Sequence, residues 1–275
     1  VTMPCGREPP SLAAVPPVID TPGQAALLSE ALQSAAAGKD VCFVGNSGEG
    51  KTVLARRLAR ALGYPATAVH TFHLYKDMTS RDFLLRRSTD DRGDTYWEPS
   101  PLLTAALKGG VCVIDGVQRL RPDTIATLQA LASDRDLELA DGTRLCSRER
   151  YVEMCGADGL QAVPPDFLDL GEGRQLRPIH EAFRLIALAT PPGQRPIEQW
   201  LSAEVLPLFA WILVPQLGPA ERASVLQARA PSPKLPELLS VAQRLEASSD
   251  KTPAAEKSWA LSLRQLIRLA RRVQQ

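Results

Sequence analysis

Short runs of apolar residues alternate with segments of helical periodicity through the middle of the chain. Residues 41–44 and 111–114 are continuous apolar runs, as expected for strands that are buried on both faces. Between these runs, leucines recur every fourth position within residues 51–62, which is typical of a helix with one buried face. This alternation of strand and helix predicts a parallel sheet that is covered by helices.

The same patterns predict the other elements of the chain. Further strands are expected at 68–74 and 183–189, helices at 24–37, 77–87, 101–107 and 122–133, and a hairpin at 137–145 around Asp141-Gly142. After Pro215 the strand pattern stops, and helical segments are expected near 219–229, 234–248 and 255–273. The prolines of the first twenty residues indicate a linker.

Composition narrows the class of protein. Hydrophobic residues make up 44% of the 275 residues and charged residues 23%, which is ordinary for a soluble globular protein. The net charge of +1 gives no reason to expect nucleic acid as a partner. The five cysteines are scattered and odd in number, so we expect a reducing compartment and neither a disulfide framework nor a zinc site.

The longest apolar stretch, residues 205–217, is interrupted by Pro207 and Pro215 and is shorter than the ~20 residues that a membrane span needs. We therefore expect no transmembrane segment. Because the chain begins with Val1 and a proline-studded run, we take it as a piece of a longer protein.

A phosphate-binding loop is the strongest motif in the chain. Residues 45–52 read G-N-S-G-E-G-K-T, which fits G-x-x-x-x-G-K-[ST] between a predicted strand and a predicted helix. In such loops glycines let backbone N–H groups point at a phosphate, and the helix N-terminus adds a positive dipole. A chance glycine-rich turn is the alternative, and the number of matching positions disfavours it. The expected nucleotide-binding residues are Gly45, Asn46, Ser47, Gly48, Glu49, Gly50, Lys51, Thr52 and Val53.

The chemistry of this motif assigns two of its residues and one carboxylate elsewhere. Lys51 would reach the β- and γ-phosphates of ATP, and the Thr52 hydroxyl would coordinate Mg²⁺. Asp115 ends the apolar run 111–114 and would hold the metal from the opposite side. Any buried strand can end in Asp, but the position roughly 60 residues after the loop favours the metal role.

Together with further stretches of the chain, these motifs resemble the midasin/MoxR-like AAA+ modules. More narrowly, they resemble the modules of a long protein of that group that also carries a von Willebrand factor A domain. The resemblance rests on residues 45–55, 74–82, 93–97, 100–107, 114–120, 141–145, 183–188 and 261–266. It implies a P-loop AAA+ parallel-sheet α/β sandwich with a small C-terminal helical lid, and ATP bound between the two. It also implies assembly with other AAA+ modules of the same chain or ring, a protein client, and a mitochondrial setting.

Compared residue by residue with that family, Lys51, Thr52 and Asp115 match. Arg264 falls where the family places a lid arginine that touches the γ-phosphate; a solvated arginine beside Arg268, Arg271 and Arg272 is an equal alternative. Thr190 stands where the sensor strand usually ends in Asn. The resemblance therefore implies Asp115, Thr190 and Arg264 as catalytic residues.

Two departures from the family pattern bear on catalysis. Gly116 replaces the Glu that usually follows the metal-binding Asp and activates water, and Leu208 stands where an arginine finger is expected. We therefore expect an ATP- and Mg²⁺-binding module with weak or absent hydrolysis; the alternative is an active ATP hydrolase that remodels a protein partner. His70 and His73 alternate on one strand, and we expect packed or surface histidines there rather than a metal pair.

These assignments predict a domain organisation. We expect an N-terminal linker and helix over residues 1–40, a nucleotide-binding core over 41–215 and a helical lid over 216–275.

Overall fold

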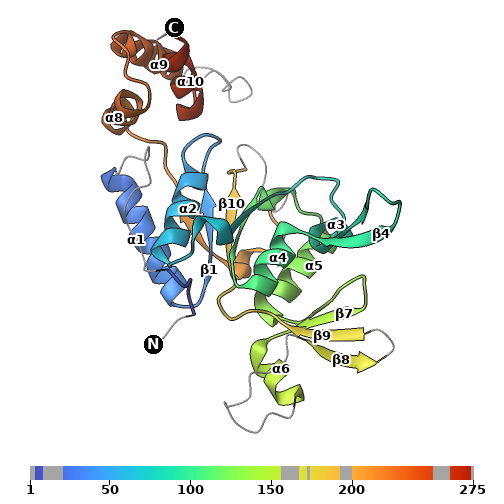
Figure 1. Cartoon of the computed structure of the whole chain (residues 1–275). Helices are drawn as coiled ribbons and strands as arrows, with labels where there is room; N and C mark the ends of the chain where they lie inside the picture. Colours follow the sequence, from blue (N-terminus) through green and yellow to red (C-terminus); the bar gives the residue numbers. More distant parts are fainter. Residues whose placement is uncertain are drawn as a thin grey trace.

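The computed structural model describes residues 4–8, 21–155, 167–171, 174–192, 200–249 and 261–273 (Figure 1). It is a parallel-sheet α/β fold with a group of helices at its C-terminal end, as the sequence predicts. Most of the predicted linker, residues 1–20, lies outside the described ranges. Within those ranges, no helix combines the length and apolar character that crossing a bilayer requires.

The central sheet has five parallel strands in the order β11-β1-β10-β5-β2. They are β1 (Asp40–Val44), β2 (Val69–His73), β5 (Val111–Asp115), β10 (Arg184–Ala189) and β11 (Phe209–Leu213). The sequence did not predict β11, because the prolines at 207 and 215 made its apolar run look broken. Both prolines lie outside the strand, which pairs with β1 over its whole length.

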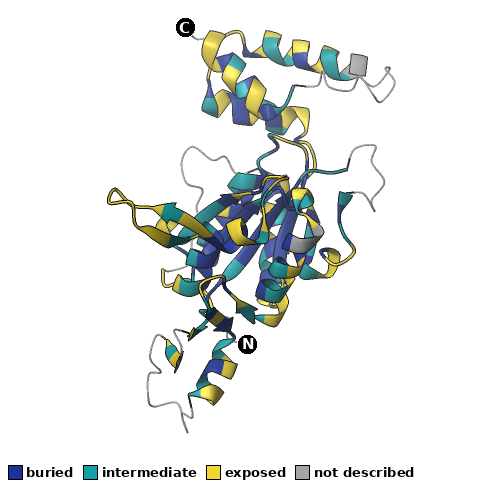
Figure 2. Cartoon of the chain, turned by 90° about the vertical axis from the view of Figure 1, so that its right-hand side faces the viewer, coloured by how far each residue is buried: buried dark blue, intermediate teal, exposed yellow. Residues whose placement is uncertain are grey.

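Alternating strand residues build two separate apolar cores. Val41 and Phe43 of β1 face a core that includes α1 (Pro22–Ala36) and α2 (Lys51–Ala61). Cys42 and Val44 face the other core, with α4 (Pro101–Lys108) and α5 (Pro122–Gln129). Helices therefore cover both faces of the sheet (Figure 1), and the strands are the most buried part of the molecule (Figure 2).

One predicted helix is shorter than expected. The pattern of residues 77–87 predicts a helix through Arg87, but α3 (Ser80–Leu84) ends at Leu84. Thr79 caps it, in a capping box with Asp82. The next residues form β3 (Leu85–Thr89), which pairs with β4 (Thr95–Pro99) in an exposed hairpin (Figure 2). Strand pairing in this hairpin overrides the helical pattern.

A second, four-stranded sheet lies at the end of the molecule opposite the C-terminal helices (Figure 1). It contains the predicted hairpin, β6 (Leu137–Glu138) and β7 (Thr143–Cys146), and two strands that the sequence did not predict, β8 (Leu168–Gly171) and β9 (Arg174–Pro178). Helix α6 (Arg148–Met154), also not predicted, packs Tyr151 against Cys146 and Leu176 of this sheet. Short helical turns complete the order: η1 (Ala66–Ala68), η2 (Val117–Arg119), η3 (Ala130–Asp134) and η4 (Leu206–Leu208).

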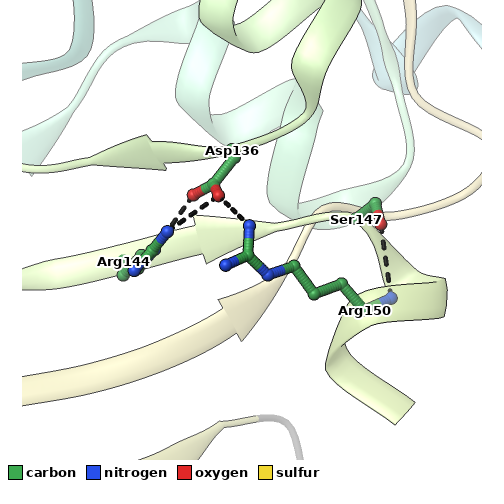
Figure 3. A network of polar contacts seen from close by, with 4 residues as sticks. All are labelled: Asp136, Arg144, Ser147 and Arg150. Carbon is green, nitrogen blue, oxygen red and sulfur yellow. Dashed lines mark hydrogen bonds and ion pairs between the residues drawn. The ribbon is translucent and has the colours of Figure 1, made fainter. Parts of the chain in front are cut away.

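An ionic network joins the hairpin to α6 (Figure 3). Asp136 accepts two hydrogen bonds from Arg144, at 3.0 and 2.8 Å, and one from Arg150. The Oγ of Ser147 in turn accepts a hydrogen bond from the backbone N–H of Arg150 at the start of α6. The hydrogen bonds from Arg144, with the charges of both arginines, lower the pKa of the Asp136 carboxyl.

This network predicts a pH-dependent contribution to stability. Because the pKa of Asp136 is lower in the folded chain than its unfolded value of about 3.9, the network stabilises the fold above that pH and is lost as the pH falls through the folded-state pKa. At pH 7 we expect Asp136→Asn to lower the thermal midpoint by about 1–3 °C, the scale of a surface ion pair.

The difference between Asp136→Asn and wild type should shrink towards zero near pH 2, in thermal unfolding followed by circular dichroism. The control is Asp91→Asn, which removes the same charge from the exposed tip of the β3–β4 hairpin. A destabilisation by Asp136→Asn that is independent of pH would contradict the assignment.

The C-terminal helices form a cluster with its own apolar core. They are α8 (Pro219–Arg229), α9 (Leu235–Ser249) and α10 (Leu263–Val273), and we call them the lid. The buried apolar residues of this core are Leu217, which precedes α8, and Val225, Leu226, Leu235, Ala242, Leu263 and Leu266 of the helices. The predicted start of the last helix, near 255, lies outside the described ranges, which omit residues 250–260; α10 itself begins at Leu263.

Candidate functional site

The loop between β1 and α2 has the backbone shape that the motif predicts. Gly48 and Gly50 both have φ near +91°, a conformation that side chains with a Cβ adopt only with strain. Gly50 is the residue that precedes α2, so the helix N-terminus opens directly onto the loop. The backbone N–H of Gly45 donates to the carbonyl of Ala189, which ties the loop to the end of β10.

Lys51 is buried beneath this loop. Its Nζ donates hydrogen bonds to the carbonyls of Gly45 at 2.6 Å and Asn46 at 2.8 Å. Burial lowers the pKa of Lys51, and the charges of Asp115 and Glu49 act in the opposite direction. The ammonium is thus fixed at the loop in a partly desolvated place, where its attraction for an anion is stronger than in water.

Asp115 lies at the carboxyl end of β5 and has a neighbour that the sequence did not predict. Strands β2 and β5 pair in parallel, and their register places His73 opposite Asp115. The His73 Nδ1 lies 3.3 Å from the Asp115 Oδ2, and both side chains are partly exposed. The sequence predicts a packed or surface histidine here, and His73 is exposed, but the sequence does not predict its pairing with Asp115. The signal that could have found it is that both strands end at the same edge of the sheet.

Gly116 lacks the carboxylate of the Glu that the family has here, and its backbone conformation favours glycine. Its φ of +95° lies in the left-handed region, and its N–H donates to the carbonyl of Leu188. A Cβ added to Gly116 would lie 3.3 Å from side-chain atoms of Arg119. Any side chain at Gly116 would therefore be strained and close to a guanidinium.

Thr190 and Leu208 have different positions relative to the loop. Thr190 follows β10 and lines the same cavity as the loop, while its carbonyl accepts a hydrogen bond from Trp200 at 2.7 Å. Leu208 is half-buried in η4, packed against the core that contains α4 and α5.

The start of α10 in the lid lies against the phosphate loop. A Cβ added to Gly48 would lie 2.9 Å from the Cβ of Ser262 and 3.4 Å from that of Arg264. Arg264, Arg268 and Arg271 are spaced at i, i+4 and i+7, so they follow one face of α10. The buried Leu266 and Ala270 lie on the other face of the helix, which fixes the arginine face towards the loop.

A cavity of about 570 Å³ lies between the loop and the lid. Of the residues predicted from the sequence, it is lined by Ser47, Gly48, Gly50, Lys51, Thr52, Val53, Asp115, Thr190 and Arg264. Gly45, Asn46 and Glu49 are described but are not part of the lining. The residues that the sequence did not predict are Gln24, His73, Arg119, Leu188, Val225, Arg229, Leu263, Ile267, Arg268 and Arg271.

The lining is strongly cationic. Among its described residues are Lys51 and five arginines, against a single carboxylate, Asp115. Such a concentration of positive charge attracts a polyanion. Apolar lining residues, among them Val225 and Ile267 of the lid, offer a surface for the uncharged part of a ligand.

The donor atoms also fit a magnesium ion carried by a phosphate ligand. A hydroxyl from Thr52 and a carboxylate from Asp115 are oxygen ligands, which Mg²⁺ prefers, and Mg²⁺ is usually held by few protein groups together with substrate phosphates. Within the described part of the chain, no cluster of three or more His, Cys, Asp or Glu side chains could hold a metal by itself.

Comparison with known proteins agrees with this architecture. Residues 40–209 match the family described as AAA domain (dynein-related subfamily). The chain is 39% identical over 260 residues to von Willebrand factor A domain-containing protein 8 of Mus musculus, which covers 93% of this chain and 13% of that protein. It is 34% identical over 131 residues to denitrification regulatory protein NirQ of Pseudomonas aeruginosa, covering 48% of this chain and 44% of that protein.

Among solved structures, the chain resembles NtrX from Brucella abortus in complex with ATP. The TM-score is 0.56 at 15% sequence identity, covering 95% of this chain and 53% of that one, which shows a shared fold. The chain therefore spans only part of each relative, from about an eighth to about half of its length. The predicted resemblance to MoxR-like modules and to von Willebrand factor A domain-containing protein 8 is confirmed, and this chain belongs to the dynein-related subfamily of the AAA domain family.

Proposed function

We propose that the chain is an ATP- and Mg²⁺-binding module of a larger ring-type AAA+ ATPase, with weak or absent hydrolysis at this site. One observation carries the proposal: the phosphate loop, Asp115 and the arginine face of α10 line the same cavity. That NtrX, which shares the fold, forms a complex with ATP supports the choice of nucleotide.

Each residue has a role that follows from its place. The backbone N–H groups of the loop and Lys51 would bind the β- and γ-phosphates, and Arg264 would approach the γ-phosphate from the lid. Thr52 and Asp115 would hold the Mg²⁺ ion, which neutralises phosphate charge when bound. Arg268 and Arg271 add further positive charge to the lining of the cavity.

Weak hydrolysis follows from Gly116 and Leu208. Loss of a general base typically costs ~10²–10⁴ in rate. The left-handed backbone of Gly116 also means that this position is built for glycine, so a carboxylate there would need a different local structure. Leu208 offers no charge to a neighbouring module, whereas an arginine finger contributes ~10³–10⁵ in turnover.

The alternative, an active ATP hydrolase that remodels a protein partner, is favoured by one observation. His73 lies beside Asp115 and lines the cavity, so its imidazole and the Thr190 hydroxyl offer polar groups that could orient a water molecule. Histidine is a frequent general base in enzymes.

Single-turnover hydrolysis of ATP by the chain distinguishes the two functions. We expect a rate at least about 10²-fold below the ~1–10 s⁻¹ of ordinary enzymes. A rate within that ordinary range would establish the alternative. The matched variants are Gly116→Glu and Gly116→Ala, because both strain the backbone at φ +95° but only glutamate adds a carboxylate. Faster hydrolysis by Gly116→Glu than by Gly116→Ala would show that the missing base limits the rate.

We also propose the wider setting of the module. The division into an N-terminal linker and helix (1–40), a core (41–215) and a lid (216–275) is supported by the separate apolar core of the lid helices. The family resemblance implies assembly, so other AAA+ modules of the same chain or ring are the proposed partners, with a protein client. A mitochondrial setting is proposed from the resemblance to von Willebrand factor A domain-containing protein 8. Imaging of the full-length protein tests this location.

A further inference from the structure

Arg119 brings a positive charge from the core of the molecule to the wall of the cavity. Five arginines are among the described lining residues, and the other four belong to the lid helices α8 and α10. Arg119 instead lies in η2, the turn that follows β5 and Gly116. Its side chain is exposed, so a ligand in the cavity can contact it. The core therefore contributes a cation in addition to Lys51 of the phosphate loop.

The turn folds the side chain of Arg119 back over Gly116. The backbone N–H of Arg119 donates to the Gly116 carbonyl at 2.9 Å, which closes the turn. A Cβ added to Gly116 would lie 3.3 Å from each of the Cδ, Nε and Cζ atoms of Arg119. The guanidinium group therefore lies where a side chain at position 116 would begin, and a larger residue there would force it to move. Glycine at 116 and arginine at 119 are thus complementary.

A hydrogen bond holds this guanidinium at the edge of the central sheet. The Nη1 atom of Arg119 donates to the carbonyl of Leu74 at 3.1 Å. Leu74 directly follows β2, and its own N–H donates to the carbonyl of Asp115 at 2.9 Å. Strands β2 and β5 are paired neighbours, so Arg119 is attached to the carboxyl ends of both. The side chain is therefore ordered by the protein itself, which reduces the entropy that ligand binding costs.

The positive charge of Arg119 is not used in an ion pair with another described residue. Asp115, the carboxylate of the lining, lies beside His73 instead, at 3.3 Å. The Leu74 carbonyl is neutral and accepts one of the five N–H donors that a guanidinium carries. The charge of Arg119 is therefore available to an anion in the cavity.

The place of Arg119 next to Asp115 indicates which phosphate it meets. In the proposed function Asp115 holds the Mg²⁺ ion, and such ions bridge the β- and γ-phosphates of a bound nucleotide. Gly116 is the next residue of the chain, and Arg119 covers it. A cation at this end of the site faces the γ-phosphate, whereas the phosphate loop is sufficient to hold a diphosphate. The planar fork of arginine suits this contact, because it can donate two hydrogen bonds to one phosphate.

We propose that Arg119 is a specificity-determining residue, which binds the terminal phosphate of ATP and makes the site prefer a triphosphate to a diphosphate. Gly116 leaves room for its guanidinium, so a cation lies beside the position where the family usually carries a water-activating carboxylate. The proposal rests on the proposed function, because it concerns the γ-phosphate end of the same site. A site of this kind retains ATP more strongly than ADP, as suits a module that binds nucleotide without rapid hydrolysis.

The experiment compares the affinity of the chain for a non-hydrolysable ATP analogue with its affinity for ADP, both with Mg²⁺, by titration calorimetry. The analogue makes the comparison independent of any hydrolysis. We expect Arg119→Gln to weaken binding of the ATP analogue by about tenfold or more, the scale of one hydrogen bond between charged groups. The affinity for ADP should change by no more than about twofold. Arg119→Lys, which keeps the charge but loses the planar fork, should lose less affinity for the analogue than Arg119→Gln.

Arg81→Gln is the matched control, because it removes the same charge from an exposed position of α3 that is not part of the cavity lining. We expect it to leave both affinities within about twofold of wild type. Equal losses for the ATP analogue and for ADP in Arg119→Gln would overturn the proposal, as would an unchanged affinity for the analogue. Both of these outcomes leave the proposed function intact. A wild-type chain that binds neither nucleotide would instead overturn the proposed function, and this proposal with it.

Discussion

Replacing Lys51 with alanine is expected to weaken ATP binding by at least about a hundredfold. Hydrogen bonds to charged groups contribute ~1.5–3 kcal/mol each, and a lysine that meets two phosphate groups loses about two of them, or roughly 3 kcal/mol. Every 1.4 kcal/mol corresponds to a tenfold change in affinity. Lys51 is buried, and its Nζ is held by a loop carbonyl, so alanine at this position leaves no ammonium at the loop.

The measurement is titration calorimetry with ATP and Mg²⁺, accompanied by a thermal midpoint to show that the variant is folded. Lys39→Ala is the matched control, because it removes the same charge from an exposed position at the end of the segment before β1. Equal affinity of Lys51→Ala and Lys39→Ala for ATP would contradict the role of Lys51 and the phosphate loop in nucleotide binding.

Replacing Phe183 with alanine is expected to cause the largest loss of stability. Phe183 is fully buried just before β10, and the guanidinium of Arg135 lies 4.8 Å from its ring centroid. Truncation of a buried phenylalanine typically costs about 3–5 kcal/mol, a large part of the ~5–15 kcal/mol that stabilises most domains. For a chain of this size we expect a fall in the thermal midpoint on the order of 10 °C.

Phe167→Ala is the control for this prediction. Phe167 also has a guanidinium over its ring, that of Arg177 at 5.5 Å, but is 42% exposed. We expect Phe167→Ala to change the midpoint by no more than a few degrees, in thermal unfolding followed by circular dichroism. A similar fall for both variants would mean that the cation–π pair, and not burial in the core, dominates at Phe183.

The sequence predicts the parts of the fold that are set by local pattern. Three of the predicted strands of the central sheet, β1, β5 and β10, are short apolar runs. The helices between the strands show clear periodicity and clear ends, such as Ser100 with Pro101 at the start of α4 and Gly109 at its end. The missed strands have weaker or interrupted signals. β8 and β9 are short and largely polar on a small sheet, and β11 is an apolar run that prolines 207 and 215 flank.

The residues of the candidate site also fall into those that the sequence predicts and those that it does not. Residues 45–52 form one contiguous motif, and Asp115 ends a contiguous apolar run. Their chemistry can be inferred from the sequence alone. His73 requires knowledge that β2 and β5 are neighbours. Gln24, Arg119, Arg229 and Arg268 likewise reach the cavity from elements whose placement depends on packing. Sequence motifs therefore predict the ligand class, while the other residues that line the cavity depend on tertiary structure.

The central claim is that nucleotide binds between the phosphate loop and the lid. Hydrogen–deuterium exchange of the chain, with and without ATP and Mg²⁺, tests it most directly, because it reports on both sides of the cavity in one measurement. We expect protection of residues 45–54 together with residues 262–268 of the lid. Protection of neither segment, or a response confined to the distant sheet of β6 to β9, would contradict the account.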